Sequence, residues 1–177
     1  MVADPSVVVG GELEVAVAAF AYEGAMRRIL SRFKYGGASR LARPLAEAAG
    51  PILSKVSSVA SADVYLVPVP IHPDRLRRRG YNQAALLATH LGRVFARPVE
   101  EVLARQRPTM QQHRLNRAQR LRNLRQAFAP GSGARSPRSV ILVDDILTTS
   151  ATLEACAAVL RSAGAEQVVG VAIARDL

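Results

Sequence analysis

The sequence predicts an α/β fold in which helices flank a central, mainly parallel sheet. Segments with strand character alternate along the chain with segments of helical periodicity. The expected strands are short and continuously apolar, which is typical of parallel sheets that are buried on both faces. The clearest unit is 139–174, where strand, turn, helix and strand follow one another over about 35 residues, the length of a βαβ unit.

Strands and helices alternate through the first half of the chain. The elements expected there are strand 14–22, helix 23–34, a helical stretch 38–56, strand 64–69, a helical turn 74–79 and a helix from its N-cap Asn82 to Phe95. Gly36 and Gly37 end the first helix, and Pro44 and Pro51 are expected to interrupt the second. The residues of the last helix expected to face the core are Ala85, Leu86, Ala88 and Leu91.

The second half contains a polar, arginine-rich stretch, 104–127, which is expected to be a mobile loop or a basic helix. The other elements expected there are a weak strand 99–103, a flexible loop 131–137, strand 139–143, a polar turn 144–150, helix 151–163 and strand 168–174. We expect residues 1–177 to form a single domain, with 1–12 flexible.

Positive charge is concentrated in one part of the chain. The formal net charge is +10, and all but two of the basic residues are arginine. Residues 71–125 hold thirteen arginines and only three acidic residues. Because the guanidinium fork matches phosphate oxygens in shape and charge, we expect a small phosphoester, a nucleic acid, or both as partners. The alternative, an arginine-rich composition that only solvates helix faces, leaves the clustering unexplained.

Composition excludes several classes of protein. Hydrophobic residues make up 49% of the chain, which is enough for a packed core. The single cysteine, Cys156, excludes an internal disulfide and a zinc site built on paired cysteines, so no zinc is expected. We expect Cys156 to be a buried thiol. No stretch is long and apolar enough to span a bilayer, and residues 1–10 lack the basic start of a signal peptide. We therefore expect a cytoplasmic protein without a membrane partner.

The turn after strand 139–143 is the predicted ligand site, because ligands of parallel sheets bind beyond the carboxyl ends of the strands. Asp144 and Asp145 are costly side by side unless a ligand uses them. Small hydroxylated residues then begin a helix, whose free N–H groups and dipole favour a phosphate. Together they predict a ribose 5-phosphate site. The alternative, an N-cap at Thr149 or Ser150 with Asp145 supporting the helix dipole, leaves most of the motif unexplained.

This turn also carries a resemblance to a known family. The run Val140–Thr152 resembles the signature of type I phosphoribosyltransferases, which bind phosphoribosyl pyrophosphate (PRPP), although these enzymes usually have glycine at the position of Ser150. A serine there is expected to fit only with a negative φ. The chain is further similar to the ComF family of phosphoribosyltransferase-like proteins at 20–24, 33–37, 67–70, 79–83, Thr109, Gln112, Leu115, Arg120 and Asn123. That family is associated with DNA uptake in competent bacteria, usually behind a four-cysteine zinc ribbon that has no counterpart in this sequence.

The resemblance implies a type I phosphoribosyltransferase-like fold and a role for each part of the site. Asp144 and Asp145 would be the catalytic pair that holds the ribose hydroxyls. The residues implied in binding the 5′-phosphate are Thr148, Thr149, Ser150, Ala151 and Thr152. Those implied in binding pyrophosphate are Pro70, Ile71, His72, Arg75 and Arg79. His72 and His113 are candidate acids or bases, with a simple hydrogen bond to the ligand as the alternative.

Residues 105–123 resemble the mobile loop that closes over PRPP in these enzymes. The side chains implied in reaching the ligand are Arg107, Thr109, Gln112 and Arg120. The alternative is a fixed basic helix along a nucleic-acid backbone. Since only Tyr81, Phe95 and Phe128 lie near the arginine-rich stretch 71–125, the basic window, little aromatic surface is expected for stacking bases.

The predicted function is PRPP binding with Mg²⁺ by a ComF-type protein, without a metal held directly by protein side chains. The first hypothesis is transfer of the ribosyl group to an acceptor that the sequence does not reveal, with a link to DNA uptake. The alternative is a non-catalytic protein that senses PRPP or another ribose 5-phosphate ligand, or that binds single-stranded DNA. A homodimer is a further open alternative.

Overall fold

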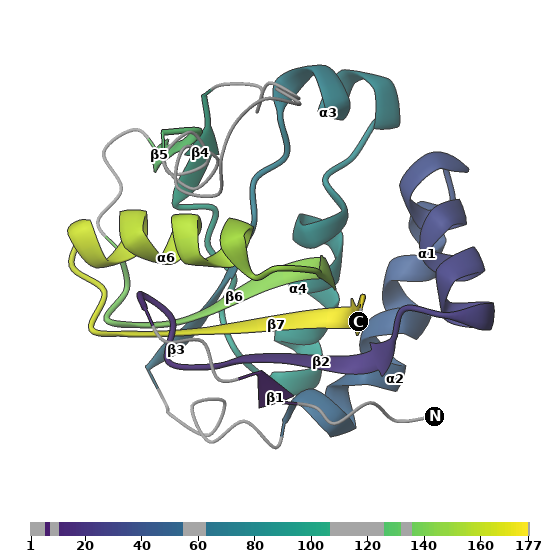
Figure 1. The fold of residues 1–177 in the computed structure, drawn as a ribbon, viewed down its shortest axis with the longest axis horizontal. Helices are drawn as coiled ribbons and strands as arrows, with labels where there is room; N and C mark the ends of the chain where they lie inside the picture. The colour runs from purple at the N-terminus through teal and green to yellow at the C-terminus, as the bar shows by residue number, and fades with distance from the viewer. Residues whose placement is uncertain (1–5, 8–10, 55–62, 107–125, 132–135, 177) are drawn as a thin grey trace.

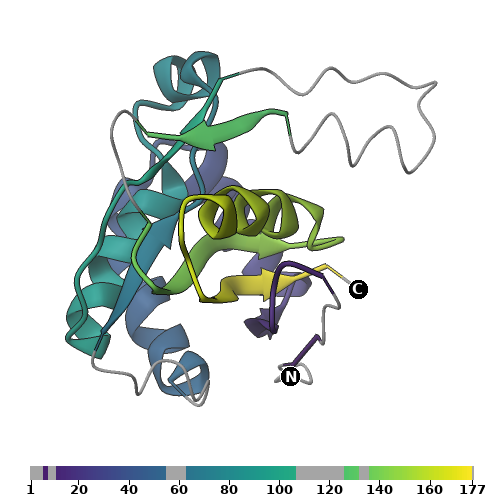
Figure 2. The same cartoon turned by 90° about the vertical axis from the view of Figure 1, so that its left-hand side faces the viewer.

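The computed structural model describes residues 6–7, 11–54, 63–106, 126–131 and 136–176, and in these ranges five strands form one sheet with the order β1-β2-β7-β6-β3 (Figures 1 and 2). The strands of this sheet are β1 (Ser6–Val7), β2 (Ala16–Ala21), β3 (Val64–Pro68), β6 (Ser139–Leu147) and β7 (Gln167–Arg175). The helices are α1 (Gly24–Tyr35), η1 (Ser39–Leu41), α2 (Ala42–Leu53), α3 (Pro73–Arg79), α4 (Gln83–Phe95) and α6 (Ala151–Ser162).

The predicted α/β class is confirmed. Strands β2, β7, β6 and β3 are parallel, and only the short edge strand β1 is antiparallel to its neighbour. One face of the sheet packs against α1, α2 and α4, and the other packs against α6, which gives two hydrophobic clusters separated by the sheet. Within the described residues, no helix is both long and apolar enough to cross a membrane.

Strand β6 is longer than the sequence predicted, and this places the two carboxylates in the strand rather than in the turn. The apolar run ends at Val143, but β6 continues because β7 runs on beside it, as far as Leu147 opposite Arg175. The predicted polar turn over 144–150 is therefore wrong for its first four residues. The turn itself comprises residues 148–150.

The prolines of α2 do not interrupt it, contrary to the expectation from sequence. The helix runs unbroken from Ala42 to Leu53. Pro44 lies in the first turn, where the missing N–H would have had no partner within the helix. Pro51 is exposed and stands in the last turn, where a single backbone hydrogen bond is lost.

Helix α4 begins as predicted but buries a slightly different stripe. The side chain of Asn82 caps it by accepting a hydrogen bond from the N–H of Ala84. Its buried residues are Gln83, Ala84, Leu87, Ala88, Leu91 and Gly92, whereas Ala85 and Leu86, which were expected in the core, are half-buried. At Gly92 a Cβ would lie 2.9 Å from the carbonyl oxygen of Arg97, so this position requires glycine.

A second, two-stranded sheet packs on α6 outside the main one. It pairs β4 (Leu103–Arg105) with β5 (Phe128–Pro130) in antiparallel register. The weak strand predicted at 99–103 is therefore displaced, and Val99 forms only an isolated bridge to Leu66. Of the predicted excursion 104–127, the structure describes residues 104–106 and 126–127.

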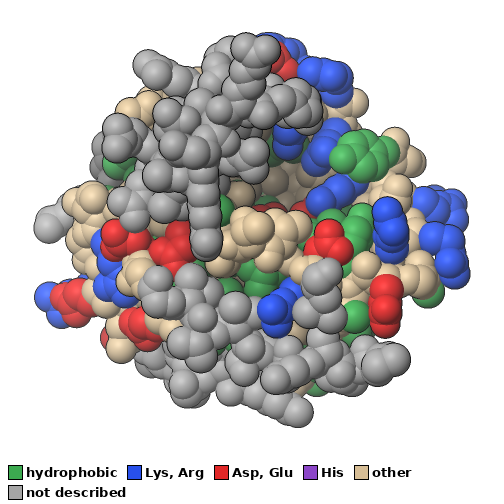
Figure 3. All heavy atoms as spheres, viewed as in Figure 1, with side chains coloured by type: hydrophobic (Ala, Val, Ile, Leu, Met, Phe, Trp, Pro, Cys, Tyr) green, Lys and Arg blue, Asp and Glu red, His purple; other side chains and the backbone are tan. Residues whose placement is uncertain are grey.

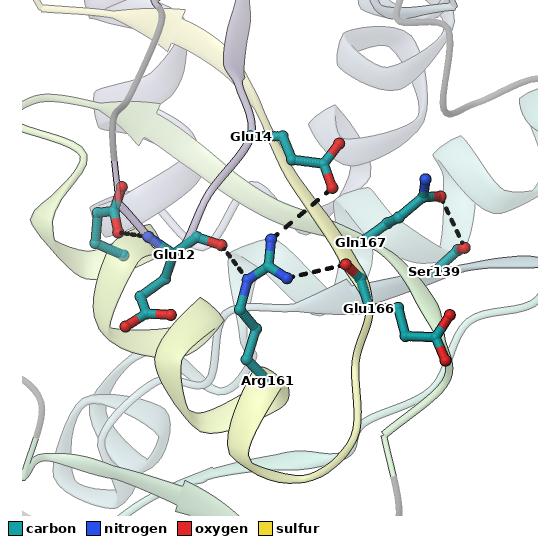
Figure 4. Close-up of polar contacts among 7 residues, drawn as sticks. Glu12, Glu14, Ser139, Arg161, Glu166 and Gln167 are labelled. Atoms are coloured by element: carbon teal, nitrogen blue, oxygen red, sulfur yellow. Dashed lines mark hydrogen bonds and ion pairs between the residues drawn. The ribbon is translucent and has the colours of Figure 1, made fainter.

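Residues 11–14 lie against α6 and are fastened to it by Arg161 and Glu154 (Figure 4). Arg161 donates from Nε to the carbonyl oxygen of Glu12 at 2.6 Å and from Nη1 to that of Glu166 at 2.9 Å, and Nη2 lies 3.8 Å from a carboxylate oxygen of Glu14. At the other end of the helix, Glu154 accepts a hydrogen bond from the N–H of Glu12 at 2.8 Å. Glu12, the last residue of the segment predicted to be flexible, is therefore held at both its N–H and its carbonyl group.

Candidate functional site

The turn between β6 and α6 brings free backbone N–H groups to the carboxyl edge of the sheet (Figure 1). Thr148 and Thr149 are exposed, and α6 begins at Ala151. The N–H groups of a first helical turn have no partner within the helix. Here Ser150, the N-cap residue, does not cap them, because its hydroxyl donates to the carbonyl oxygen of Thr149 at 2.6 Å. The amides of Ala151 and Thr152 therefore remain available to an anion.

The backbone of Ser150 contradicts the expectation of a negative φ. Its φ is +53° and its ψ is −5°, in the left-handed region. A residue with a Cβ pays about 1–2 kcal/mol for this conformation, whereas glycine adopts it freely. The turn thus keeps the shape that glycine would allow, and the serine accommodates it under strain.

Asp144 and Asp145 turn toward opposite faces of β6, since consecutive side chains of a strand alternate. Asp145 is buried with 7% of its surface exposed and faces the side covered by α1. Asp144 is half-buried and faces the side of α6, and its Oδ1 accepts a hydrogen bond from the N–H of Asp145 at 2.8 Å. The two carboxyls are thus adjacent in the chain but have different surroundings.

Burial and the neighbouring Asp145 carboxylate raise the pKa of Asp144 to about 7. The hydrogen bond from the N–H of Asp145 and the charge of Lys34 act in the opposite direction and only partly offset this effect. Asp144 therefore changes its charge close to neutral pH. Burial, and after it the Asp144 carboxylate, also raises the pKa of the Cys156 thiol, so the predicted buried cysteine lies close to the site.

Lys34 forms an ion pair with Asp145 that sequence reasoning missed. Its Nζ lies 3.0 Å from Oδ1 of Asp145, and the lysine and aspartate side chains are 20% and 9% exposed. Lys34 stands in the last turn of α1, more than a hundred residues from the carboxylates. The available signal was its place in the segment 33–37 that resembles the ComF family.

The segment proposed for pyrophosphate lies beside the same edge. The N–H of Val69 donates to the carbonyl oxygen of Val143 at 2.9 Å, which ties this segment to β6 just before the carboxylates. Pro70, Ile71 and His72 follow and are half-buried. Nδ1 of His72 accepts a hydrogen bond from the N–H of Asp74 at 3.2 Å, so the histidine caps α3.

Basic side chains gather over α1 and α3, around a hollow on the face drawn in Figure 3. Arg75 is exposed on α3. Arg79 is half-buried: its guanidinium lies 4.9 Å from the centre of the Tyr35 ring, and its Nη1 donates to Oε1 of Gln83 at 3.0 Å. Arg79 thus connects the end of α1 to the start of α4.

Two of the segments that resemble the ComF family, 33–37 and 79–83, are packed together. The hydroxyl of Tyr81 donates to the carbonyl oxygen of Phe33, and the two rings lie 5.8 Å apart. Burial raises the pKa of Tyr81, which keeps the hydroxyl a donor. Residues 107–125, which include Arg107, Thr109, Gln112, His113 and Arg120, lie outside the described residues.

Arg105 is a further cation beside the site, and the sequence did not single it out. It stands at the end of β4, and its guanidinium lies 5.1 Å from the centre of the Phe128 ring on β5. Burial, and after it the charge of Arg75, lowers the pKa of Arg105, while Asp144 acts in the opposite direction. Arg75 and Asp144 are thus both near enough for Arg105 to respond to their charges.

Comparison with known proteins confirms the resemblance to the ComF family. The chain is 31% identical over 151 residues to Competence protein ComFC of Streptococcus pneumoniae, an alignment that covers 85% of this chain and 64% of that protein. It is 38% identical over 106 residues to Competence protein F of Haemophilus influenzae, covering 58% and 46%. It is 37% identical over 107 residues to the DNA utilization protein YhgH of Escherichia coli K12, covering 58% and 45%. The chain thus matches about half to two thirds of the length of these relatives.

Comparisons with models of protein families and with solved structures add little to this relationship. None of the models of known protein families matches the chain. Among solved structures, the glutamine PRPP amidotransferase of Bacillus subtilis in complex with ADP and GMP is similar with a TM-score of 0.45 and 21% identity, over 77% of this chain and 26% of that one. A likeness of this size supports no conclusion about the chain.

Proposed function

Since the chain is homologous to the ComF-type competence proteins, we propose that it is a phosphoribosyltransferase-like protein that binds PRPP and acts in the handling of DNA taken up by the cell. The observation that carries the proposal is the arrangement of polar groups at the carboxyl end of β6. Paired carboxyls there stand next to a helix that begins with free N–H groups. Acceptors for sugar hydroxyls beside donors for a phosphate are what a ribose 5-phosphate requires.

In this proposal the 5′-phosphate binds at the turn formed by Thr148, Thr149 and Ser150 and at the N–H groups of Ala151 and Thr152. The dipole of α6, a helix of twelve residues, favours the negative charge there. Asp144 and Asp145 accept hydrogen bonds from the ribose hydroxyls.

Pyrophosphate binds on the opposite side of the ribose in this proposal. Pro70, Ile71 and His72 offer backbone groups, and Arg75 and Arg79 on α3 supply positive charge. Arg79 already contacts Tyr35 and Gln83, so it would turn from these partners or share its donors with the ligand.

Mg²⁺ belongs to the substrate in this proposal. No three histidine, cysteine, aspartate or glutamate side chains among the described residues are grouped closely enough to hold a metal. A Mg²⁺ ion bound to pyrophosphate oxygens would neutralise charge on the leaving group.

The reaction proposed is transfer of the ribosyl group with release of pyrophosphate. The bond from the anomeric carbon to the pyrophosphate oxygen breaks, positive charge develops on the sugar ring, and an acceptor forms the new bond. The carboxylate of Asp145, which forms an ion pair with Lys34, stabilises the positively charged ring electrostatically, and the cations of α3 stabilise the departing pyrophosphate.

Calorimetric titration with PRPP and Mg²⁺ tests the proposal. We expect binding by the unaltered chain and binding at least about tenfold weaker for Asp145→Asn, because a charged acceptor of a hydroxyl is lost. Asp176→Asn, at an exposed position after β7, is the matched control and should bind normally. Absence of PRPP binding by the unaltered chain would contradict the proposal. Incubation with PRPP and a panel of bases, monitored for pyrophosphate release, then separates an enzyme from a sensor.

Single-stranded DNA is a second candidate ligand, favoured by one observation. Tyr35 is 73% exposed with the Arg79 guanidinium near its ring, beside the exposed arginines of α3. It supplies a stacking surface outside the basic window considered from sequence. If DNA binds there, Tyr35→Ala should weaken oligonucleotide binding at every salt concentration, whereas Val94→Ala, at an exposed position on α4, should not. Equal affinities for both variants would exclude Tyr35 as the surface.

A further inference from the structure

The ion pair between Lys34 and Asp145 is more enclosed than the other ion pairs among the described residues. Both side chains have at least four fifths of their surface covered, whereas the pairs Arg43–Glu47 and Arg138–Glu166 are largely exposed. At 3.0 Å, and with little surrounding water, this attraction is screened less than that of a surface pair. Removing the ammonium would leave a buried carboxylate without its counter-charge.

Lys34 is held in place from several sides. Phe33, the preceding residue, is fully buried and packs against Tyr81, whose hydroxyl donates to the Phe33 carbonyl oxygen. Tyr35, the following residue, lies under the Arg79 guanidinium. The residues on either side of Lys34 are thus both anchored to segment 79–83, so the lysine approaches Asp145 from a fixed backbone.

The ammonium contacts one carboxyl of the pair. It reaches Asp145 on the face covered by α1, while Asp144 points to the opposite face. The groups near Asp144 in the described structure are Asp145 and its N–H on the same strand, Lys34 on α1, Arg105 on β4 and Cys156 on α6. Two chemically identical side chains thereby acquire different electrostatic surroundings.

We propose that Lys34 is the positioning residue of the carboxyl pair, which holds Asp145 ionised and in a fixed direction and leaves Asp144 as the member that exchanges a proton. This proposal rests on the proposed function in that the ribose hydroxyls are the expected ligands of the pair. Asp145 is then a permanent hydrogen-bond acceptor for one hydroxyl. Asp144 accepts from a hydroxyl when ionised and donates when protonated, so the pair responds to pH through one of its members.

The first test needs no ligand. The pKa values of the aspartates are measured by NMR on protein labelled with ¹³C at the aspartate carboxyls, in the unaltered chain and in Lys34→Met and Lys34→Arg. We expect the pKa of Asp145 to rise by about 1–3 pH units in Lys34→Met and to be restored in Lys34→Arg. Arg32→Met, which removes a charge from an exposed position on the same helix, is the matched control and should leave Asp145 unchanged. An unchanged Asp145 in a folded Lys34→Met protein would overturn the proposal.

The second test measures PRPP·Mg²⁺ affinity against pH for the same proteins. We expect the affinity of Lys34→Met to fall below that of the unaltered chain as the pH is lowered, and the difference to shrink as the pH rises. A loss of equal size at every pH would show a purely structural role and overturn the proposal. If the unaltered chain binds no PRPP, the proposed function fails, whereas the carboxyl titration still decides whether Lys34 controls Asp145.

Discussion

The raised pKa of Asp144 predicts that this carboxyl makes the fold less stable as the pH rises. An aspartate ordinarily loses its proton near pH 3.8, and in the folded chain Asp144 loses it at about 7. The folded state therefore binds the proton more tightly than the unfolded state does. The favourable contribution is complete below about pH 4 and is lost as the pH rises through 7. A pKa difference of one unit corresponds to about 1.4 kcal/mol, so the free energy of unfolding falls by about 4 kcal/mol at most between the two pKa values. We expect a loss of about 2–4 kcal/mol because Asp144 is only half-buried.

The perturbation that tests this is Asp144→Asn, which keeps the size of the side chain and an oxygen for the N–H of Asp145. Urea unfolding of both proteins at pH 4, 6 and 8 measures the free energy of unfolding. We expect the variant to equal the unaltered chain at pH 4 and to exceed it by about 2–4 kcal/mol at pH 8. Asp176→Asn serves as control, with no change in pH dependence. A difference between Asp144→Asn and the unaltered chain that is the same at pH 4 and pH 8 would refute the reasoning.

Three further substitutions test local features of the fold by urea unfolding. Ser150→Gly should raise the free energy of unfolding by up to about 1 kcal/mol, because glycine adopts the left-handed φ without strain; a lower stability would contradict this. Gly92→Ala should lower it by about 1–3 kcal/mol, because the methyl would press on a backbone oxygen, while exposed Thr89→Ala stays within about 0.5 kcal/mol. Arg161→Met should cost about 1–3 kcal/mol and speed amide hydrogen exchange in residues 11–14, since the carbonyl of Glu12 loses its donor; unchanged exchange rates would argue against the fastening role.

The sequence was a reliable guide to the fold class and to the start of α4. The alternation of apolar strands and amphipathic helices predicted the α/β class, and Asn82 correctly marked the start of α4. The same reasoning ended β6 too early, at Val143, because it counted only apolar residues. The strand continues through both carboxylates because β7 pairs with it, and such pairing cannot be recognised in either strand alone.

Within the candidate site, sequence reasoning pointed to segments that the structure places side by side, but it did not find their partners. The motif indicated Asp144 and Asp145, but the faces they occupy depend on the strand extension described above. Lys34 and Tyr35 lie far from the basic window along the chain, and only folding brings them to Asp145 and Arg79. The rule that residues other than glycine adopt a negative φ failed at Ser150. The turn between β6 and α6 imposes a positive φ on this serine against its own preference.

The fastening of residues 11–14 along α6 has a consequence for how the protein opens. A helix tied near both ends to the chain that leads into β2 cannot fray independently, so the turn 148–150 and residues 11–14 should protect their amides together as one cooperative unit. The N–H groups at the start of α6 are then oriented before any anion arrives. An anion that binds them does not have to order the helix first, and more of its interaction energy appears as affinity.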